Sequence, residues 1–385
     1  METAIFCAKT LKGFAGVGVV LTIIGLGVFQ AVADDSKKQV LPTETSTIAT
    51  NGDLNPYGVA FVPEGFPKGG KTGAGDILVS NFNATNNAPQ GTGTTIVSIS
   101  PDGTSSPFFQ GAAPLGLTTA LGVLQKGFVI VGNLPTSAGV VQPPGSLIVL
   151  DKNGNQVSGS PFVDATFLDG PWDLTVVDKG NSATVFVSCV LNGTVTRFDL
   201  NISGGTVTLT NKVQIAGGYT FGPNTAALVV GPTGLAYDSS SDVLYVASTA
   251  DNEIFAVADA AKTATSTTPG TVIFSDATHL HGPLGLVLAP NGNLISSQGD
   301  AINPSTDPSQ QSEMVEFSPG GKGGKGGKNG KGGKGGQGTF VTEFSIDSAA
   351  GAAFGIAIER NKGATTFAAV DDSMNALTVY NFSEK

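Results

Sequence analysis

The stretch GPTGLAYDSSSDVLYVASTADNEIFAV, from Gly231 to Val257, decides the fold of this chain. Proline and glycine open it, and two polar turns divide the apolar runs that follow. Short runs rich in β-branched and aromatic residues between such turns predict β-strands. The same phrase recurs with variations at intervals of about 50 to 60 residues, which is the spacing of propeller blades. The three strands predicted within it are 235–237, 243–247 and 253–257.

Five further copies of the leading proline-glycine phrase occur, each followed by two apolar runs. A single sheet of this kind cannot bury both faces, so it is stable only when it stacks against neighbouring sheets, and a closed ring completes the stack. The sequence therefore predicts an all-β fold, a six-bladed β-propeller of four-stranded antiparallel blades. The other copies begin at Pro56, Pro114, Pro171, Pro283 and Phe354, the last of which lacks the proline.

The two ends of the repeat array predict how the ring closes. The sixth copy runs to Lys385 with no fourth strand after its third, whereas earlier copies have one. Residues 44–50, just ahead of the first copy, are expected to supply the missing outer strand of the last blade. Fourth strands of the earlier copies are predicted at 106–110, 206–215, 271–275 and 339–346.

Residues 1–33 have the features of a signal peptide. Lys9 and Lys12 precede an uninterrupted apolar run from Gly13 to Phe29, and Ala31-Val32-Ala33 fits the small-residue rule for cleavage after Ala33. The prediction is a secreted protein, extracellular or periplasmic, whose residues 34–385 form one propeller domain. The alternative is an uncleaved anchor, because the run is near the lower limit for spanning a bilayer.

The charge balance excludes one class of partner. Of 20 basic and 30 acidic side chains, removal of Glu2, Lys9 and Lys12 leaves 18 and 29, a net charge of about −11. Nucleic-acid binding is not expected of so acidic a body. Residues 319–338, PGGKGGKGGKNGKGGKGGQG, are predicted to form a disordered loop inside blade five, because glycine and evenly spaced lysines cannot hold a fixed backbone. The insert is either a cationic tether or a tolerated surface expansion.

A ring of polar side chains is predicted around the propeller axis. Aligning the copies on the end of the second strand makes six residues equivalent, and the loops there lie on one face. Amide and carboxylate oxygens bind hard cations, so Ca²⁺ at the central channel is a candidate cofactor, with Asn81, Asn133 and Asp371 as ligands. A water-filled polar channel is the alternative. The remaining members of the ring are Cys189, Ser248 and Gln298, which are expected to line the channel.

Histidine and aromatic residues provide two further candidates. His281 precedes the proline-glycine phrase of copy five, two residues after His279, and is expected on the same face as the ring. Such a pair suits a metal or a general base, or a turn satisfied by backbone carbonyls. Tyr57 and Trp172 each follow a leading proline and are candidates for an aromatic rim around a sugar or another flat ligand. Packing between blades is the alternative role.

The phrase from Pro232 to Ile254, with PTGL, LYVAST and DNEI in turn, resembles the NHL-type repeat. The resemblance covers nearly all of residues 34–385. It implies a six-bladed propeller of the kind found in senescence-marker and gluconolactonase-type lactonases, streptogramin lyases and a zinc-dependent amidating lyase. For a lactonase it implies a central divalent cation, with Asn81, Asn133 and Asp371 as its ligands. The acidic residue that such lactonases place after the first leading phrase has no counterpart, because Asp53 lies before Pro56.

These observations favour a binding or scaffold module over an enzyme. No GxSxG, P-loop, HExxH or CxxC motif occurs. The expected partner is a protein, a polysaccharide or a small molecule, bound by a monomer that contacts no membrane beyond its signal segment. The alternative is a metal-dependent lactonase or lyase with its site at the central channel. Long loops predicted to bind are 82–93, 134–145 and 299–313.

Overall fold

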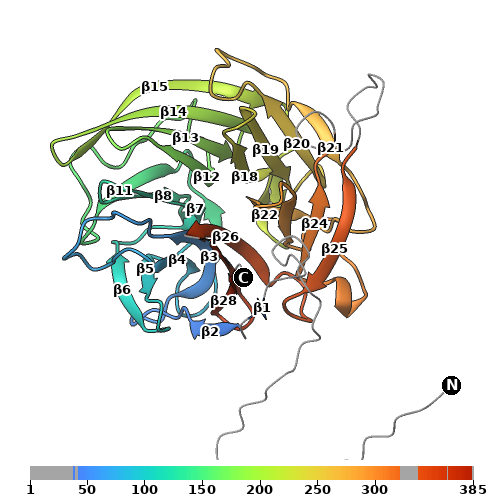
Figure 1. Ribbon diagram of the computed structural model, residues 1–385, viewed down its shortest axis with the longest axis horizontal. Helices are drawn as coiled ribbons and strands as arrows, with labels where there is room; N and C mark the ends of the chain where they lie inside the picture. The colour runs from blue at the N-terminus through green and yellow to red at the C-terminus, as the bar shows by residue number, and fades with distance from the viewer. Residues whose placement is uncertain (1–37, 40–41, 321–336, 362, 384–385) are drawn as a thin grey trace, which may run out of the picture.

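The computed structural model describes residues 38–39, 42–320, 337–361 and 363–383. The described chain forms sheets that surround a central axis as the blades of a propeller (Figure 1). Its only helical segment is the 3-10 turn η1 (Pro308–Gln310), and no helix in these ranges is long and apolar enough to cross a bilayer. The prediction of an all-β, six-bladed propeller is confirmed. The predicted signal segment, 1–33, and residues 321–336 of the glycine-lysine insert lie outside the described residues.

Each blade is an antiparallel meander, and the first strands of successive blades contact one another around the axis. Blade one contains β3 (Leu54–Phe61), β4 (Ile77–Asn83), β5 (Thr95–Ile99) and β6 (Ser105–Gln110). Blade three contains β12 (Pro171–Asp178), β13 (Ser182–Cys189), β14 (Thr194–Ser203) and β15 (Thr206–Gly217). Blade four contains β18 (Pro232–Asp238), β19 (Val243–Ser248), β20 (Glu253–Ala258) and β21 (Thr271–Phe274). Blade five contains β22 (Pro283–Leu288), β23 (Leu294–Gln298), β24 (Glu313–Ser318) and β25 (Thr339–Ser345).

Blade two departs from this pattern at its outer edge. Its sheet contains β7 (Leu117–Leu124), β8 (Phe128–Asn133) and β11 (Ser146–Asp151). Instead of a regular fourth strand, residues 156–162 pair with β11 through isolated bridges from Leu147 to Phe162 and from Leu150 to Gln156. Two small ribbons are added to the blades. They are β9 (Thr136–Ser137) with β10 (Val140–Val141), and β16 (Gly222–Asn224) with β17 (Leu228–Val230).

The ring is closed by pairing the two parts of the chain that are farthest apart in sequence. Blade six contains β26 (Ala353–Asn361), β27 (Ala364–Asp371) and β28 (Ala376–Ser383). Its outer strand is β2 (Thr43–Ser46), which pairs antiparallel with β28 so that Thr43 faces Val379. The short strand β1 (Lys38–Gln39) pairs with the far end of β28. Closure by a strand from just ahead of the first blade is therefore confirmed.

The glycine of the leading phrase is explained by how closely the inner strands approach. A Cβ on Gly355 would lie 1.8 Å from the Tyr57 carbonyl oxygen of blade one, and a Cβ on Gly234 would lie 2.4 Å from that of Leu284 in blade five. Only glycine leaves room for such contacts. In blade three Asp173 takes this place. One of its carboxylate oxygens accepts a hydrogen bond from the Leu235 N–H of blade four, at 3.0 Å, so blades three and four are joined by a side chain.

The asparagine of the turn after the second strand links one blade to the next. Asn252 and Asn375 adopt left-handed backbone conformations, with φ of 55° and 50°, which asparagine tolerates better than most residues. Asn252 Oδ1 accepts from the Gly282 N–H, and its Nδ2 donates to the Leu280 carbonyl, both at 2.8 Å. Asn375 Oδ1 accepts from the Asn55 N–H at 2.8 Å. Both turns therefore hold the segment that leads into the next blade.

Replacing Asn375 by alanine is expected to lower the free energy of unfolding by about 2 kcal/mol. The change leaves the buried Asn55 N–H without its acceptor and places alanine in the left-handed region. Urea denaturation of both proteins measures the difference. The matched control is Asn211→Ala on exposed β15, where we expect a change within about 0.5 kcal/mol. Equal losses in the two variants would contradict a role for Asn375 in closing the ring.

The hydrophobic core lies in layers between neighbouring blades. Each layer joins apolar side chains of one sheet to those of the next, for example Leu78, Ile96 and Phe108 of blade one with Val129 and Ile148 of blade two. The layer between blades six and one extends beyond the two sheets that it joins. It continues to the end of the axis where the second strands finish, and it includes side chains from the other blades as well.

Candidate functional site

The strand register places the six aligned residues in equivalent positions. Each is paired with the residue that precedes a bulge in the inner strand of its blade, and the bulge aims the leading segment at the next blade. The connections from second to third strands and from one blade to the next therefore share one end of the ring, called here the upper face. The pairs are Pro56 with Asn81, Leu117 with Asn133, Pro171 with Cys189, Pro232 with Ser248, Pro283 with Gln298, and Ala353 with Asp371.

The three predicted calcium ligands have different surroundings. Asn81 Nδ2 donates to the Thr47 carbonyl at 3.0 Å, and its Oδ1 has no hydrogen-bond partner among the described residues. Asn133 Oδ1 already accepts from the Gly116 N–H at 2.9 Å. Asp371 Oδ1 accepts from the Met374 N–H at 3.0 Å. The single amide oxygen of Asn133 is therefore occupied by a backbone N–H, whereas the amide oxygen of Asn81 is left for a ligand.

The residues predicted to line a channel are all buried. Ser248 Oγ donates to Asp251 at 2.6 Å, and Gln298 Oε1 accepts from the His281 N–H at 2.9 Å. The Cys189 thiol lies 3.5 Å from the Phe167 carbonyl, and burial raises its pKa to about 12. A thiol with so high a pKa is not a nucleophile at neutral pH. These side chains stabilise loops and do not form an open polar surface.

Tyr57 and Trp172 lie in a buried aromatic cluster. They are 3% and 2% exposed, and their ring centroids are 6.0 Å apart in an edge-to-face arrangement. Phe82 and Phe354 stack on the two sides of Tyr57, with centroids 4.4 and 4.2 Å away. The packing role is therefore the one that the structure has, and a ligand rim would need exposed ring surface that neither residue offers. The cluster fills the upper end of the axis with apolar side chains.

Three buried oxygen atoms at the upper ends of blades six and one are without partners in the described part of the chain. Among the described residues, the buried atoms Asn55 Oδ1, Asn81 Oδ1 and Asp372 Oδ1 have no hydrogen-bond partner. Burial raises the pKa of Asp372 to about 7, and the neighbouring Asp371 carboxylate contributes. Burial raises the pKa of Asp371 to about 6. An oxygen-rich, desolvated site of this kind can hold a hard cation, which would restore the charged form of Asp372.

A second buried cluster in blade five was not predicted from the sequence. His281 Nε2 lies 3.7 Å from Glu313 Oε1, and the two side chains are 4% and 0% exposed. His281 Nδ1 contacts the Asn303 carbonyl, and since a carbonyl oxygen only accepts, Nδ1 is the donor. Burial, with Asp300 and Glu343 nearby, raises the pKa of Glu313 to about 9. At neutral pH Glu313 is therefore protonated and faces His281 as a neutral acid.

Asp300 ties this cluster to the loop that covers it. Its Oδ2 accepts from the Ser312 and Gly351 N–H groups, both at 2.8 Å, and so joins the loop 299–312 to the segment leading into blade six. The cluster is enclosed and has no open path to solvent through Glu313. Within the described part of the chain, no three His, Cys, Asp or Glu side chains are grouped so as to hold a metal ion. The arrangement is a buried pair of an imidazole and a carboxyl group.

An apolar groove of about 360 Å³ lies on the upper face between the two added ribbons. One wall is the β9–β10 ribbon, and the other is the β16–β17 ribbon with the turn that follows β13. Val140 and Phe221 stand at its edges and are 64% and 48% exposed, whereas Val190 and Val229 at its base are buried. No charged side chain lines it. The lining residues are Gly139, Val140, Val141, Val190, Leu191, Phe221, Gly222, Pro223, Leu228 and Val229.

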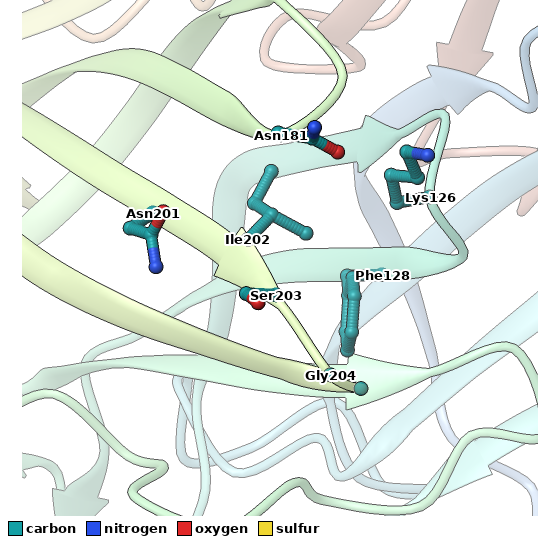
Figure 2. A pocket seen from close by; sticks show the side chains of 8 residues that line it. Lys126, Phe128, Asn181, Asn201, Ile202, Ser203 and Gly204 are labelled. Atoms are coloured by element: carbon teal, nitrogen blue, oxygen red, sulfur yellow. The ribbon is translucent and has the colours of Figure 1, made fainter.

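A second hollow, of about 400 Å³, lies at the opposite end of blades two and three. Figure 2 shows Lys126 on one side of it and Asn201 on the other, with Phe128 and Ile202 between them. Its walls are the hairpin turns after β7, β12 and β14, which every meander of this kind has. This hollow is formed by turns that occur in every blade. The apolar groove, in contrast, is formed by ribbons that are additions to the blades.

No protein-family model matches the chain, and no curated protein matches it. Solved structures that are similar to it include a luciferin-regenerating enzyme, at 12% identity over 89% of this chain and 95% of that chain, with a TM-score of 0.49. The calcium-binding protein regucalcin from Agrobacterium tumefaciens has 12% identity over 89% and 95%, with a TM-score of 0.48. A gluconolactonase from Xanthomonas campestris has 13% identity over 87% and 88%, with a TM-score of 0.44. Likenesses at this level carry no argument about activity.

Proposed function

We propose that this propeller is a binding module that holds an apolar side chain of a protein partner in the groove between its two ribbons. The observation that carries the proposal is an uncharged groove flanked by the exposed side chains of Val140 and Phe221. Exposed apolar patches on soluble proteins mark interaction sites. The cores of protein interfaces combine apolar and aromatic side chains with an absence of charge, and the groove has this composition.

The origin of the groove supports a binding role. The ribbons β9–β10 and β16–β17 are additions to connecting loops and take no part in the four-stranded meanders. Leu228, on the second ribbon, has a left-handed backbone with φ of 60°, which costs a residue with a Cβ about 1 kcal/mol or more. The blade fold does not require this conformation, which sets one wall of the groove. Strained backbone conformations of this kind cluster at active sites and at sites that hold a ligand.

Replacing Phe221 by serine is expected to weaken binding of a neutral probe about tenfold. The reason is that the probe loses its contact with the exposed half of the Phe221 ring. The probe is a fluorophore-labelled, uncharged peptide, acetyl-Gly-Ser-Leu-Phe-Ser-Gly-amide, and its anisotropy is followed as protein is added. Val163→Ser is the matched control, since Val163 is 60% exposed and is not one of the residues that line the groove. Equal affinities for both variants and the wild type, or no saturable binding at all, would rule out the groove as the binding site.

A second candidate function, a cation-dependent lactonase or lyase, rests on the partnerless oxygens of Asn55, Asn81 and Asp372. Asn81 fits a hard cation better than Asn133 does, because the amide oxygen of Asn133 is already hydrogen-bonded. A bound cation would supply Lewis acidity toward a substrate carbonyl. The protein's own contribution would be desolvation of Asp372, which makes its carboxylate depend on a nearby positive charge.

Calcium titration by calorimetry tests this second candidate without reference to any substrate. If it is right, the wild type binds one Ca²⁺, and Asp372→Asn weakens binding at least tenfold, because the only carboxylate of the three ligands is lost. Asp347→Asn, on the connection between blades five and six, is the control. Two results would rule out this candidate and leave the binding module. One is the absence of Ca²⁺ binding by the wild type, and the other is an equal Ca²⁺ affinity of Asp372→Asn and the control variant.

A further inference from the structure

We infer that the segment bound by the groove is basic, with an apolar side chain flanked by lysine or arginine. This inference rests on the proposed function. The groove selects an apolar side chain, but its apolar lining does not determine which residues flank that side chain in the partner. That information comes from the charges around the groove and from their distribution over the two ends of the ring.

The described connections carry lysine at one end of the ring only. The connections that form the upper face contain no lysine or arginine. Lysines occur instead at the opposite end, in the turns between first and second strands and between third and fourth strands. Lys212 of β15 reaches these connections, where its ammonium group pairs with Asp164. Apart from that pair, the Lys, Arg, Asp and Glu side chains that a partner meets on the described upper connections are carboxylates. The acidic residues of the upper connections are Asp53, Asp164, Asp169, Asp251, Asp276, Asp300, Asp307, Asp347 and Asp372, and the lysines at the opposite end include Lys68, Lys71, Lys126, Lys152, Lys179 and Lys262.

Two of these carboxylates lie beside the groove. Asp251 Oδ2 accepts from the N–H of Thr220, the residue before Phe221, at 3.1 Å. Asp169 lies beside the same wall, at the turn after β13, because its carbonyl accepts from the Leu191 N–H at 3.2 Å and Gly170 packs on the Leu191 side chain. Burial raises the pKa of Asp169, and its side chain has no hydrogen bond or ion pair to another described residue. A cation from a partner would therefore find an unneutralised carboxylate at this edge.

Charge and shape together specify the occupant. The groove has room for an apolar side chain of leucine or phenylalanine size, and Asp169 and Asp251 lie beside one of its walls. Electrostatic complementarity of this kind selects partners and accelerates association. An acidic segment with the same apolar side chain would face repulsion from Asp169 and Asp251, and a polysaccharide without charge would gain nothing from them. The structure thus fits a basic peptide segment of a protein.

Three peptides with the same length and label test this inference. They are acetyl-Lys-Lys-Leu-Phe-Lys-Lys-amide, its glutamate counterpart, and the neutral peptide with glycine and serine flanks. At low salt we expect the lysine peptide to bind at least tenfold more tightly than the glutamate peptide, with the neutral peptide between them. Raising the salt concentration should reduce this spread, since the Debye length falls from about 10 Å at 0.1 M to about 3 Å at 1 M. Asp169→Asn should weaken the lysine peptide about threefold and leave the neutral peptide unchanged.

The control is Asp102→Asn, an exposed carboxylate in a turn at the opposite end of the ring. It changes the net charge by the same amount, so a general field effect would appear in both variants. Equal binding of the three peptides, with loss of all three in Phe221→Ser, would overturn the inference and leave the groove proposal intact. Binding of the lysine peptide that Asp102→Asn weakens as much as Asp169→Asn does would also overturn it. Saturable binding of none of the peptides would remove the proposed function itself.

Discussion

Replacing Gly355 by alanine is expected to lower the free energy of unfolding by about 3 kcal/mol or more, among the largest effects of any single substitution in this chain. A Cβ at this position would lie 1.8 Å from the Tyr57 carbonyl oxygen, and the obstacle is backbone that no rotamer change can move. Blades six and one would have to separate at their inner strands, which would loosen the aromatic cluster around Tyr57. Effects of this size come from overpacking or backbone strain.

The matched control for Gly355→Ala is Gly73→Ala. An added Cβ on Gly73 meets nothing within 4 Å, and its backbone is outside the left-handed region, so alanine is accommodated. We expect a change within about 0.5 kcal/mol there, or a slight gain from the less flexible unfolded chain. Urea denaturation followed by Trp172 fluorescence measures both variants. A loss below about 1 kcal/mol for Gly355→Ala would contradict the close approach of the two inner strands.

Glu313→Gln is expected to remove a large part of the pH dependence of stability. The pKa of Glu313 is raised from 4.5 to about 9 in the folded protein, mainly by burial. Its contribution to stability is fully present below about pH 4.5, where both folded and unfolded chains carry the proton. Between pH 4.5 and 9 unfolding releases that proton, so the contribution is lost as the pH rises. The wild type should lose on the order of 6 kcal/mol across this window through Glu313, because each pKa unit corresponds to about 1.4 kcal/mol.

Glutamine keeps the shape and neutrality of the protonated acid, so the variant should retain more of its stability at pH 8 than the wild type does. Burial also raises the pKa of Asp173 and Asp372, each to about 7, so a smaller decline should remain in the variant. Thermal unfolding measured at intervals from pH 4.5 to 9 gives both curves. Glu44→Gln on the exposed strand β2 is the control and should parallel the wild type. Parallel curves for Glu313→Gln and the wild type would show that Glu313 is ionised in the fold.

The architecture could be predicted from the sequence because the repeat is local. Each leading phrase, second strand and turn lies within about 25 residues, so the spacing defines the blade, and the missing fourth strand of the last copy identifies 44–50 as its source. The alignment of second-strand ends also placed Asn81 and its five counterparts in equivalent positions. The burial of Tyr57 and Trp172 did not follow from spacing, because it depends on Phe82 and Phe354 meeting them across the axis.

The candidate sites depend on contacts between loops, which spacing does not determine. Glu313 meets His281 only because the loop 299–312 folds back over blade five, and the long separation of the two residues concealed the pair. The loop 134–145 was predicted to bind, and it supplies one wall of the groove. The other wall comes from Phe221 and Leu228, in a segment that has no repeat pattern. The sequence does contain an indication of this second wall. Residues 218–231 are rich in apolar side chains, although they lie outside the repeat, between a complete outer strand and the next leading phrase.

The measurement that tests the binding proposal most directly is a methyl NMR titration of the whole protein with the neutral Leu-Phe peptide. If the groove is the site, the methyl signals of Val140, Val141, Leu191, Leu228 and Val229 shift together and saturate at one peptide per chain. Val163, which is exposed but does not line the groove, should not shift. Saturable shifts confined to another part of the ring, with these five methyl groups unchanged, would contradict the proposal.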